Sequence, residues 1–380
     1  MTPVGKLTAL VFLVLPLAYW HDVSAATNAP KWILLSVMAP FLFAFGKPHG
    51  GGTAAMWGLL WLTWASVTML WGAPWLDGFA ELWRWVVLAL LFVVGSRLTS
   101  REFTWSAWAF ALGVAINIPF ALAQMGGWNG KLWPLESAIF SAGPGGGLMV
   151  NPNYMGAAAA LAGLLLLGMG GRKARAAGML VAAAAPAILS KGATLGLAMA
   201  GVAWTWIKGR RMAATILFLV LLIGFSVGIL WAVDWDLSHT KLSTRWVLWA
   251  NSFAAITLVG RGIGSFWSVY PEYHNAVFPS PEGLYGFSLR PQNAHHDLLN
   301  LAVETGVIGL CLALLWIKAV ISARLECPSD LGAKLCVIGF LVIGLVDFPA
   351  HIPSSAAIVF LAAGFLSRGR ALYTGGLKWT

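Results

Sequence analysis

The sequence predicts an all-α, polytopic integral membrane protein with about twelve transmembrane helices. Hydrophobic residues make up 59% of the 380 residues and charged residues only 10%, and the mean hydropathy is +0.78. A soluble protein carries roughly 25% charged residues, because its surface must be hydrated. The apolar runs are continuous and rich in Leu, Ala and Val, whereas a transmembrane β-barrel needs strands of alternating polarity. Helices that cross a bilayer therefore fit the composition.

Twelve apolar runs, separated by charged residues, Pro and Gly, are the candidate spans, and together they form one transmembrane domain over residues 1–380. The runs 176–190 and 192–207 are nearly continuous, so they form either a tight hairpin or one broken helix. The twelve runs are 5–20, 31–46, 53–71, 79–96, 104–124, 153–170, 176–190, 192–207, 213–233, 298–320, 334–348 and 353–367.

Basic residues give the orientation of these spans. If the N-terminus is cytoplasmic, Lys and Arg should gather before the first span and after each even-numbered span. Sixteen of the 24 do so. This holds only if 176–207 is a hairpin, because one broken helix would place the later basic loops on the opposite side. The net charge of +10 is thereby explained by topology and by contact with anionic lipids, and no basic soluble domain is left to bind nucleic acid. The sixteen are Lys6, Lys47, Arg97, Arg101, Arg172, Lys173, Arg175, Lys208, Arg210, Arg211, Lys318, Arg324, Lys334, Arg368, Arg370 and Lys378.

Two long segments fall on the predicted non-cytoplasmic side. One covers residues 125–152, and the other, 234–297, lies between the ninth and tenth spans. Functional residues concentrate on long loops that a rigid scaffold holds in place. We therefore expect the loop 234–297 to carry part of an active site.

Several cations lie on the side where the positive-inside rule disfavours them. Lys191 is at the tip of the predicted hairpin, and Arg245, Arg261 and Arg290 lie in the second long loop. Cations held there can bind an anion such as phosphate, or they can be ordinary loop charges and snorkelling side chains. Arg84 follows Glu81 by three residues on one helix face, which favours an internal ion pair.

A pair of histidines precedes the tenth span in AHHDLLNLAVETGVIGL (294–310). An imidazole is the usual proton acceptor near neutral pH, although a histidine at a helix start can simply be hydrated. A helix that begins there would place His295, Leu299 and Ala302 on one face, near Asp297 and Glu304. A metal site built from the histidines 274, 295, 296 and 351 lacks ligand spacing, so no metal is expected.

The same stretch resembles a signature of the O-antigen ligase and polymerase superfamily. Three further segments resemble the motifs of that family and follow in the same order. The four similar segments cover roughly residues 150 to 315. The resemblance rests on the occurrence of all four in the same order as in the family. The three are NPNYMG (151–156), SKGATLGL (190–197), and TRWVLW with LVGRGIGSF (244–249 and 258–266).

The resemblance implies a GT-C type membrane glycosyltransferase. Such enzymes take a glycan from an undecaprenyl-diphosphate carrier at the periplasmic face of the bacterial inner membrane, without metal or other cofactor. The acceptor is a lipid A-core sugar for a ligase or a second lipid-linked glycan for a polymerase, and the motifs do not separate the two. A transporter or flippase for lipid-linked saccharides is the alternative, with a similar number of spans.

The resemblance also implies roles for individual residues. His295 takes the position of the catalytic base, although His296 stands where the family has Asn and leaves open which histidine is essential. Arg245 takes the position of one diphosphate-binding arginine, and Lys191 stands in place of another. The further diphosphate-binding candidates are Arg261 and Arg290, and the supporting candidates are His296, Asp297, Glu304, Asn151 and Asn153.

Overall fold

The computed structural model describes residues 1–19, 28–46, 52–72, 74–127, 145–234, 241–277 and 291–368, and this part of the chain contains helices and no strand. The α-helices are α1 (Pro3–Val14), α2 (Asn28–Phe45), α3 (Gly52–Thr68), α4 (Trp75–Arg97), α5 (Ser100–Met125), α6 (Pro152–Gly168), α7 (Arg172–Ala182), α8 (Ala184–Ala187), α9 (Lys191–Ile207), α10 (Arg211–Asp234), α11 (Lys241–Ala254), α12 (Phe266–Tyr273), α13 (Asp297–Ile321), α14 (Pro328–Gly344) and α15 (Pro353–Leu366). Short 3₁₀ turns include η1 (Met69–Trp71), η2 (Gly147–Met149) and η4 (Pro349–His351).

Each of the twelve predicted spans contains at least one helix, and the predicted all-α class is confirmed. Within the described ranges, five helices are long and apolar enough to cross a membrane. The segment 176–190 differs from a single span, because it is divided between α7 and α8. The number of twelve crossings stays a prediction. The five long helices are Asn28–Phe45, Gly52–Trp71, Trp75–Arg97, Ser100–Met125 and Asp297–Ile321.

The hairpin interpretation of 176–207 is confirmed by the direction of the helices. The chain leaves α8 through Leu189, whose φ of 59° ends the helix before α9 begins. α7 runs antiparallel to α6, whereas α6 and α9 both run antiparallel to α14, so α7 and α9 point in opposite directions. The contacts that give these directions are Gly163 with Ala182, Leu167 with Gly178, Gly168 with Gly332, Leu164 with Gly339, Gly192 with Val346, and Gly196 with Ile343.

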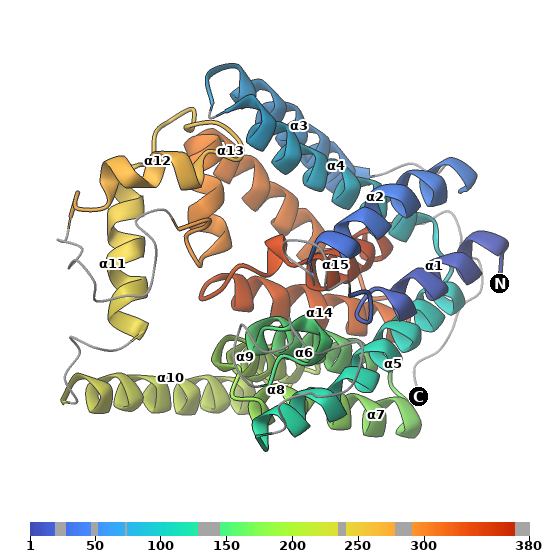
Figure 1. Ribbon diagram of the computed structural model, residues 1–380. Helices are drawn as coiled ribbons and strands as arrows, with labels where there is room; N and C mark the ends of the chain where they lie inside the picture. The colour runs from blue at the N-terminus through green and yellow to red at the C-terminus, as the bar shows by residue number, and fades with distance from the viewer. Residues whose placement is uncertain are drawn as a thin grey trace.

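The centre of the bundle is formed by α14 and α15 (Figure 1), with α4 against α15 and with α6 and α9 against α14. α15 is buried along its length except at Phe360, because it is apolar on every side. Glycine permits the close crossing of α4 and α15. A Cβ atom at Gly364 would lie 1.8 Å from the carbonyl oxygen of Phe92, so the two backbones are in direct contact.

Helix α13 is broken at Gly306, where φ is 73° and ψ is −176°. A broken helix leaves unpaired peptide groups, which are costly away from water. Here the turn 257–262 hydrogen-bonds to both sides of the break, and Trp64 adds a donor to the carbonyl of Thr305 at 2.8 Å. We call this arrangement the α13 clamp. Its backbone bonds run from Arg261 to Val303 (2.9 Å), Gly262 to Glu304 (2.8 Å), Val307 to Thr257 (3.0 Å) and Ile308 to Leu258 (3.2 Å).

Polar contacts divide the connections between helices into two sets, at opposite ends of the bundle. The set predicted to be cytoplasmic meets at one end, where Arg97 donates to the carbonyl of Phe43 and Arg368 pairs with Asp330. The other set meets where α4, α6, α9, α11 and α13 surround the end of α14, as described below. The side of the membrane that each end faces stays a prediction.

The segment 234–297 contains helical structure of its own. α11 and α12 stand at one side of the bundle (Figure 1) and pack together through a small core with Leu248, Phe266, Tyr270 and Leu299. This core ties the segment to the start of α13. Arg290, one of the predicted diphosphate-binding residues, lies outside the described residues.

Candidate functional site

The turn that follows α14 collects the main predicted site residues. The imidazole Nδ1 of His295 lies 3.8 Å from a carboxylate oxygen of Asp347, and the guanidinium of Arg245 donates a hydrogen bond to the carbonyl of Val346. The ring of Phe348 contacts the ring of His295 edge-on, at 4.7 Å between centroids. The segments 244–249 and 294–310, which are distant from residues 346–348 in sequence, therefore both contact these three consecutive residues. We call this turn, residues 346–348, the Asp347 turn.

Lys191 lies beside the same turn. It is the first residue of α9 and is exposed, and a Cβ on the following Gly192 would lie 3.2 Å from the side chain of Val346. The preceding Ser190 is buried against Gly156 of α6, where only glycine leaves room for it. This packing sets the start of α9 at the edge of the site.

The NPNYMG motif shapes the start of α6 and places an aromatic ring in the site. The side-chain oxygen of Asn151 accepts a hydrogen bond from the backbone of Asn153 at 2.8 Å, which caps the helix. One residue later, the ring of Tyr154 packs edge-on against Phe348 at 5.9 Å. The two asparagines thus help to form the scaffold, while Tyr154 makes the contact.

The two neighbouring histidines have different positions. His296 is the N-cap of α13: its Nδ1 accepts from the backbone of Leu299 at 3.2 Å and its ring packs against Trp249. Burial lowers the pKa of His296, which favours the neutral form that a cap acceptor requires. His295 has a φ of 49° and lies outside the helix. The expectation that it shares a helix face with Leu299 is therefore wrong, because α13 begins only at Asp297.

Arg261 faces away from the Asp347 turn, toward α12. Its Nε donates to the carbonyl of Ala255 at 3.2 Å, and its guanidinium lies over the ring of Tyr273 and donates to the phenolic oxygen. Its backbone is held by the α13 clamp, which fixes this direction. Of the predicted cations in the described ranges, Arg245 and Lys191 therefore adjoin the turn and Arg261 does not.

Asp297 and Glu304 belong to a second cluster. His351 of η4 lies between two carboxylates, with Nδ1 3.5 Å from Asp297 and Nε2 3.9 Å from Glu81. Glu81 also pairs with Arg84, as the sequence predicted. Glu304 is 5% exposed and accepts a hydrogen bond from the backbone of Phe266 at 3.3 Å. It therefore joins α13 to the start of α12.

The two histidine–carboxylate pairs are crossed between the same two segments. His295 and Asp297 come from the start of α13, whereas Asp347 and His351 come from the connection between α14 and α15. Sequence reasoning missed Asp347 and Tyr154, and it considered His351 only as a metal ligand. A usable signal was present in VDFPAHIP (346–353), because it puts an acid and a histidine between the last two spans, on the same predicted face as 234–297.

Within the described residues, no three His, Cys, Asp or Glu side chains are grouped closely enough to hold a metal ion. No protein-family model matches the chain, and no curated protein matches it. The motif resemblance therefore stays a prediction.

Proposed function

We propose that the chain is an inverting glycosyltransferase that moves a glycan from an undecaprenyl-diphosphate carrier to a sugar hydroxyl. The reaction takes place at the periplasmic face of the bacterial inner membrane and uses no metal. The observation that supports this most directly is the meeting of Arg245, the His295–Asp347 pair and the start of α9, which carries Lys191, at one turn. The motif resemblance assigns the chemistry to three of these four residues, namely Lys191, Arg245 and His295.

The pairing of His295 with Asp347 suits a general base. The carboxylate faces Nδ1 and stabilises the tautomer that carries its proton there, so Nε2 is left to accept a proton from a sugar hydroxyl. The same carboxylate stabilises the imidazolium that forms after the transfer. The side chain of Asp347 is only 6% exposed, so water screens this interaction little.

The cations suit the leaving group. Negative charge develops on the diphosphate as its bond to the sugar breaks, and fixed cations stabilise that charge. Arg245 uses one nitrogen for Val346, and a guanidinium has further donors to offer a phosphate. Lys191 supplies an exposed ammonium on the neighbouring helix. The hydroxyl oxygen then bonds to the anomeric carbon from the opposite face, so the configuration inverts.

A transporter or flippase is the second candidate, and the break in α13 is the feature that favours it. Broken helices in transporters present free helix ends to their cargo. In this chain the carbonyls of residues 303–305 and the amides of residues 307 and 308 already have partners in the α13 clamp. The break therefore offers few groups for binding, and we prefer the transferase.

The test is transfer by the purified protein in detergent, given lipid-linked donor and acceptor. We expect new glycosidic bonds from the unaltered protein and none from His295→Ala, while His296→Asn keeps the helix cap and remains active. Full activity of His295→Ala would refute the assignment. Product formation by the unaltered protein also separates the two candidates, since a flippase only relocates its cargo.

Lys191 and the acceptor need separate experiments. Lys191→Arg should retain activity and Lys191→Ala should lose it; indifference to alanine would remove Lys191 from the site. We favour the ligase over the polymerase. In a deletion strain, loss of a ligase leaves no repeat unit on the lipid A-core, whereas loss of a polymerase leaves one.

A further inference from the structure

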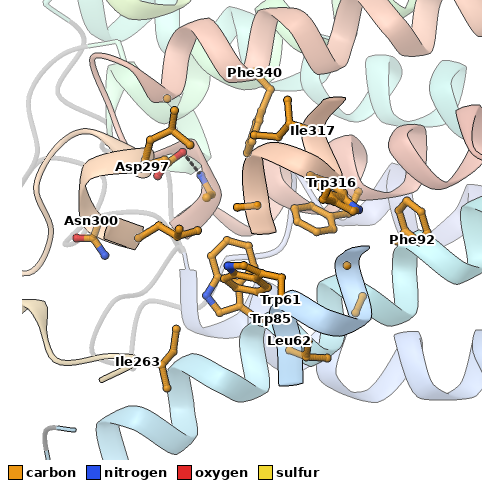
Figure 2. Close-up of a pocket in the computed structure, with 18 of the residues that line it drawn as sticks. Trp61, Leu62, Trp85, Phe92, Ile263, Asp297, Asn300, Trp316, Ile317 and Phe340 are labelled. Carbon is orange, nitrogen blue, oxygen red and sulfur yellow. Dashed lines mark hydrogen bonds between the residues drawn. The ribbon is translucent and has the colours of Figure 1, made fainter. Parts of the chain in front are cut away.

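A narrow cavity of about 230 Å³ lies beside the second histidine–carboxylate pair. It is enclosed by α3, α4, α13, α14, η4 and α15, and Figure 2 shows Asp297 and Asn300 toward one end, with Trp316 and Phe92 toward the other. Its α4 wall extends from Glu81 to Val93. Those twelve helical steps correspond to about 18 Å. The cavity is therefore long and thin.

The walls are almost entirely apolar. Trp61 and Trp85 form the middle, and Trp316 lies beyond them (Figure 2). Leu59 also lines the cavity and is 65% exposed on α3, one of the helices apolar enough to cross a membrane. The cavity therefore adjoins the surface that hydrocarbon would contact, and its shape suits a single hydrocarbon chain.

One end of the cavity is polar, with Glu81, Asp297, Glu304, Asn300 and His351. One carboxylate oxygen of Glu81 and one of Asp297 are buried and have no partner at normal hydrogen-bond distance in the described part of the chain. Their distances to His351, 3.9 and 3.5 Å, are longer than a normal hydrogen bond. Buried acceptors normally have a donor. A ligand that donates a hydrogen bond would supply it.

We propose that this cavity binds a long-chain alcohol. Its hydrocarbon chain lies along Trp85 and Trp316, and its hydroxyl donates its one hydrogen bond to the carboxylate of Asp297, beside Glu81 and His351. An anionic head group is disfavoured, since three carboxyl groups line this end, whereas the nearby cationic groups are the imidazole of His351 and Arg84, which is already paired with Glu81. The site is separate from the cationic Asp347 turn, and its occupancy does not depend on the transferase proposal.

The test is photolabelling of the full chain in detergent with dodecanol that carries a diazirine on its chain. We expect the label on cavity residues such as Trp85, Phe92 or Trp316. Unlabelled dodecanol should compete, while dodecyl phosphate, with the same chain, should compete roughly a hundredfold less well because of like-charge repulsion. Equal competition by the phosphate, or a label confined to residues outside the cavity, would overturn the proposal.

Two variants sharpen the test. Ala89 lines the cavity, so Ala89→Trp should fill it and abolish labelling, whereas Ala80→Trp, on an exposed position of the same helix, should leave labelling unchanged. Asp297→Asn removes one negative charge with little change of shape, so the preference for the alcohol over the phosphate should fall roughly tenfold. Because this second result does not depend on filling the cavity, it remains informative if Ala89→Trp fails to fold. An unchanged preference, or persistent labelling of a folded Ala89→Trp protein, contradicts the proposal.

Discussion

Replacement of Gly306 by alanine should destabilise the protein strongly. The backbone at Gly306, with φ 73° and ψ −176°, is in a region that only glycine adopts readily, so alanine adds about 2 kcal/mol of strain. Its Cβ would also lie 2.3 Å from the backbone nitrogen of Gly260 and 2.4 Å from the carbonyl oxygen of Leu258. These are backbone atoms, so the whole turn must move away.

The magnitude follows from the α13 clamp. The clamp has four backbone hydrogen bonds between the turn and the two halves of α13. If the shifted turn loses half of them, at about 1 kcal/mol each, the loss with the strain is about 4 kcal/mol. The displaced turn also carries Arg261 and Gly262, so the support of Glu304 weakens with it.

The measurement is a thermal unfolding curve in detergent, followed by the loss of the monodisperse peak in size-exclusion chromatography. Gly201→Ala is the matched control, since Gly201 lies in α9 with nothing within 4 Å of an added Cβ. That control should be neutral or slightly stabilising, by up to about 1 kcal/mol, because alanine favours the helix. Equal melting temperatures for the two variants would refute the reasoning about the clamp.

Three other predictions concern the site and the bundle. Asp347→Asn should lower kcat roughly a hundredfold or more with little change in KM, because the imidazole loses its orienting charge; a normal rate in the transfer assay would contradict this. Burial lowers the pKa of His296 in the folded protein from 6.5. The contribution of neutral His296 to the free energy of unfolding is therefore fully present above pH 6.5, and it is lost as the pH falls through the lower pKa of the folded state. His296→Asn should abolish that part of the pH dependence of melting, and an unchanged profile would exclude His296 as its source. Gly364→Ala should lower the free energy of unfolding by about 3 kcal/mol, because the added methyl group forces α4 and α15 apart. The same chromatographic assay would detect this as a lower melting temperature.

The sequence was informative about the helices because their length and apolar character are local properties. The same holds for the Glu81–Arg84 pair, which a spacing of three residues on one helix predicts. The hairpin before α9 followed from the distribution of basic residues alone. In each case the information is contained in neighbouring residues or in a rule about membrane sides.

The crossed pairing of histidines and carboxylates could not be predicted in this way. Asp297 follows His296 directly and His295 by two positions, yet it lies against His351 from another connection. The partner of His295 is Asp347, which is 52 positions further along the chain. Local spacing carries no information about such pairs, because they depend on where the start of α13 lies relative to the end of α14.

The direction of Arg261 was unpredictable for a different reason. As a cation in a glycine-rich turn, it resembled a phosphate ligand in sequence. The turn uses its backbone to close the break in α13, which directs the side chain to Tyr273. The break itself lies at a glycine, and sequence patterns allow a glycine inside a helix. The sequence therefore does not show that α13 is broken at Gly306 or that another segment must hydrogen-bond to the break.

The Asp347 turn and His351 lie close to the C-terminal end of the described chain, while their partners come from helices made much earlier. During synthesis, the contact between His295 and Asp347 therefore cannot form until α13, α14 and the connection after α14 have all been made. A chain interrupted before residue 347 would hold the imidazole but lack this carboxylate. Under the proposed mechanism, the site is therefore assembled only after α14 has been made and has packed into the bundle.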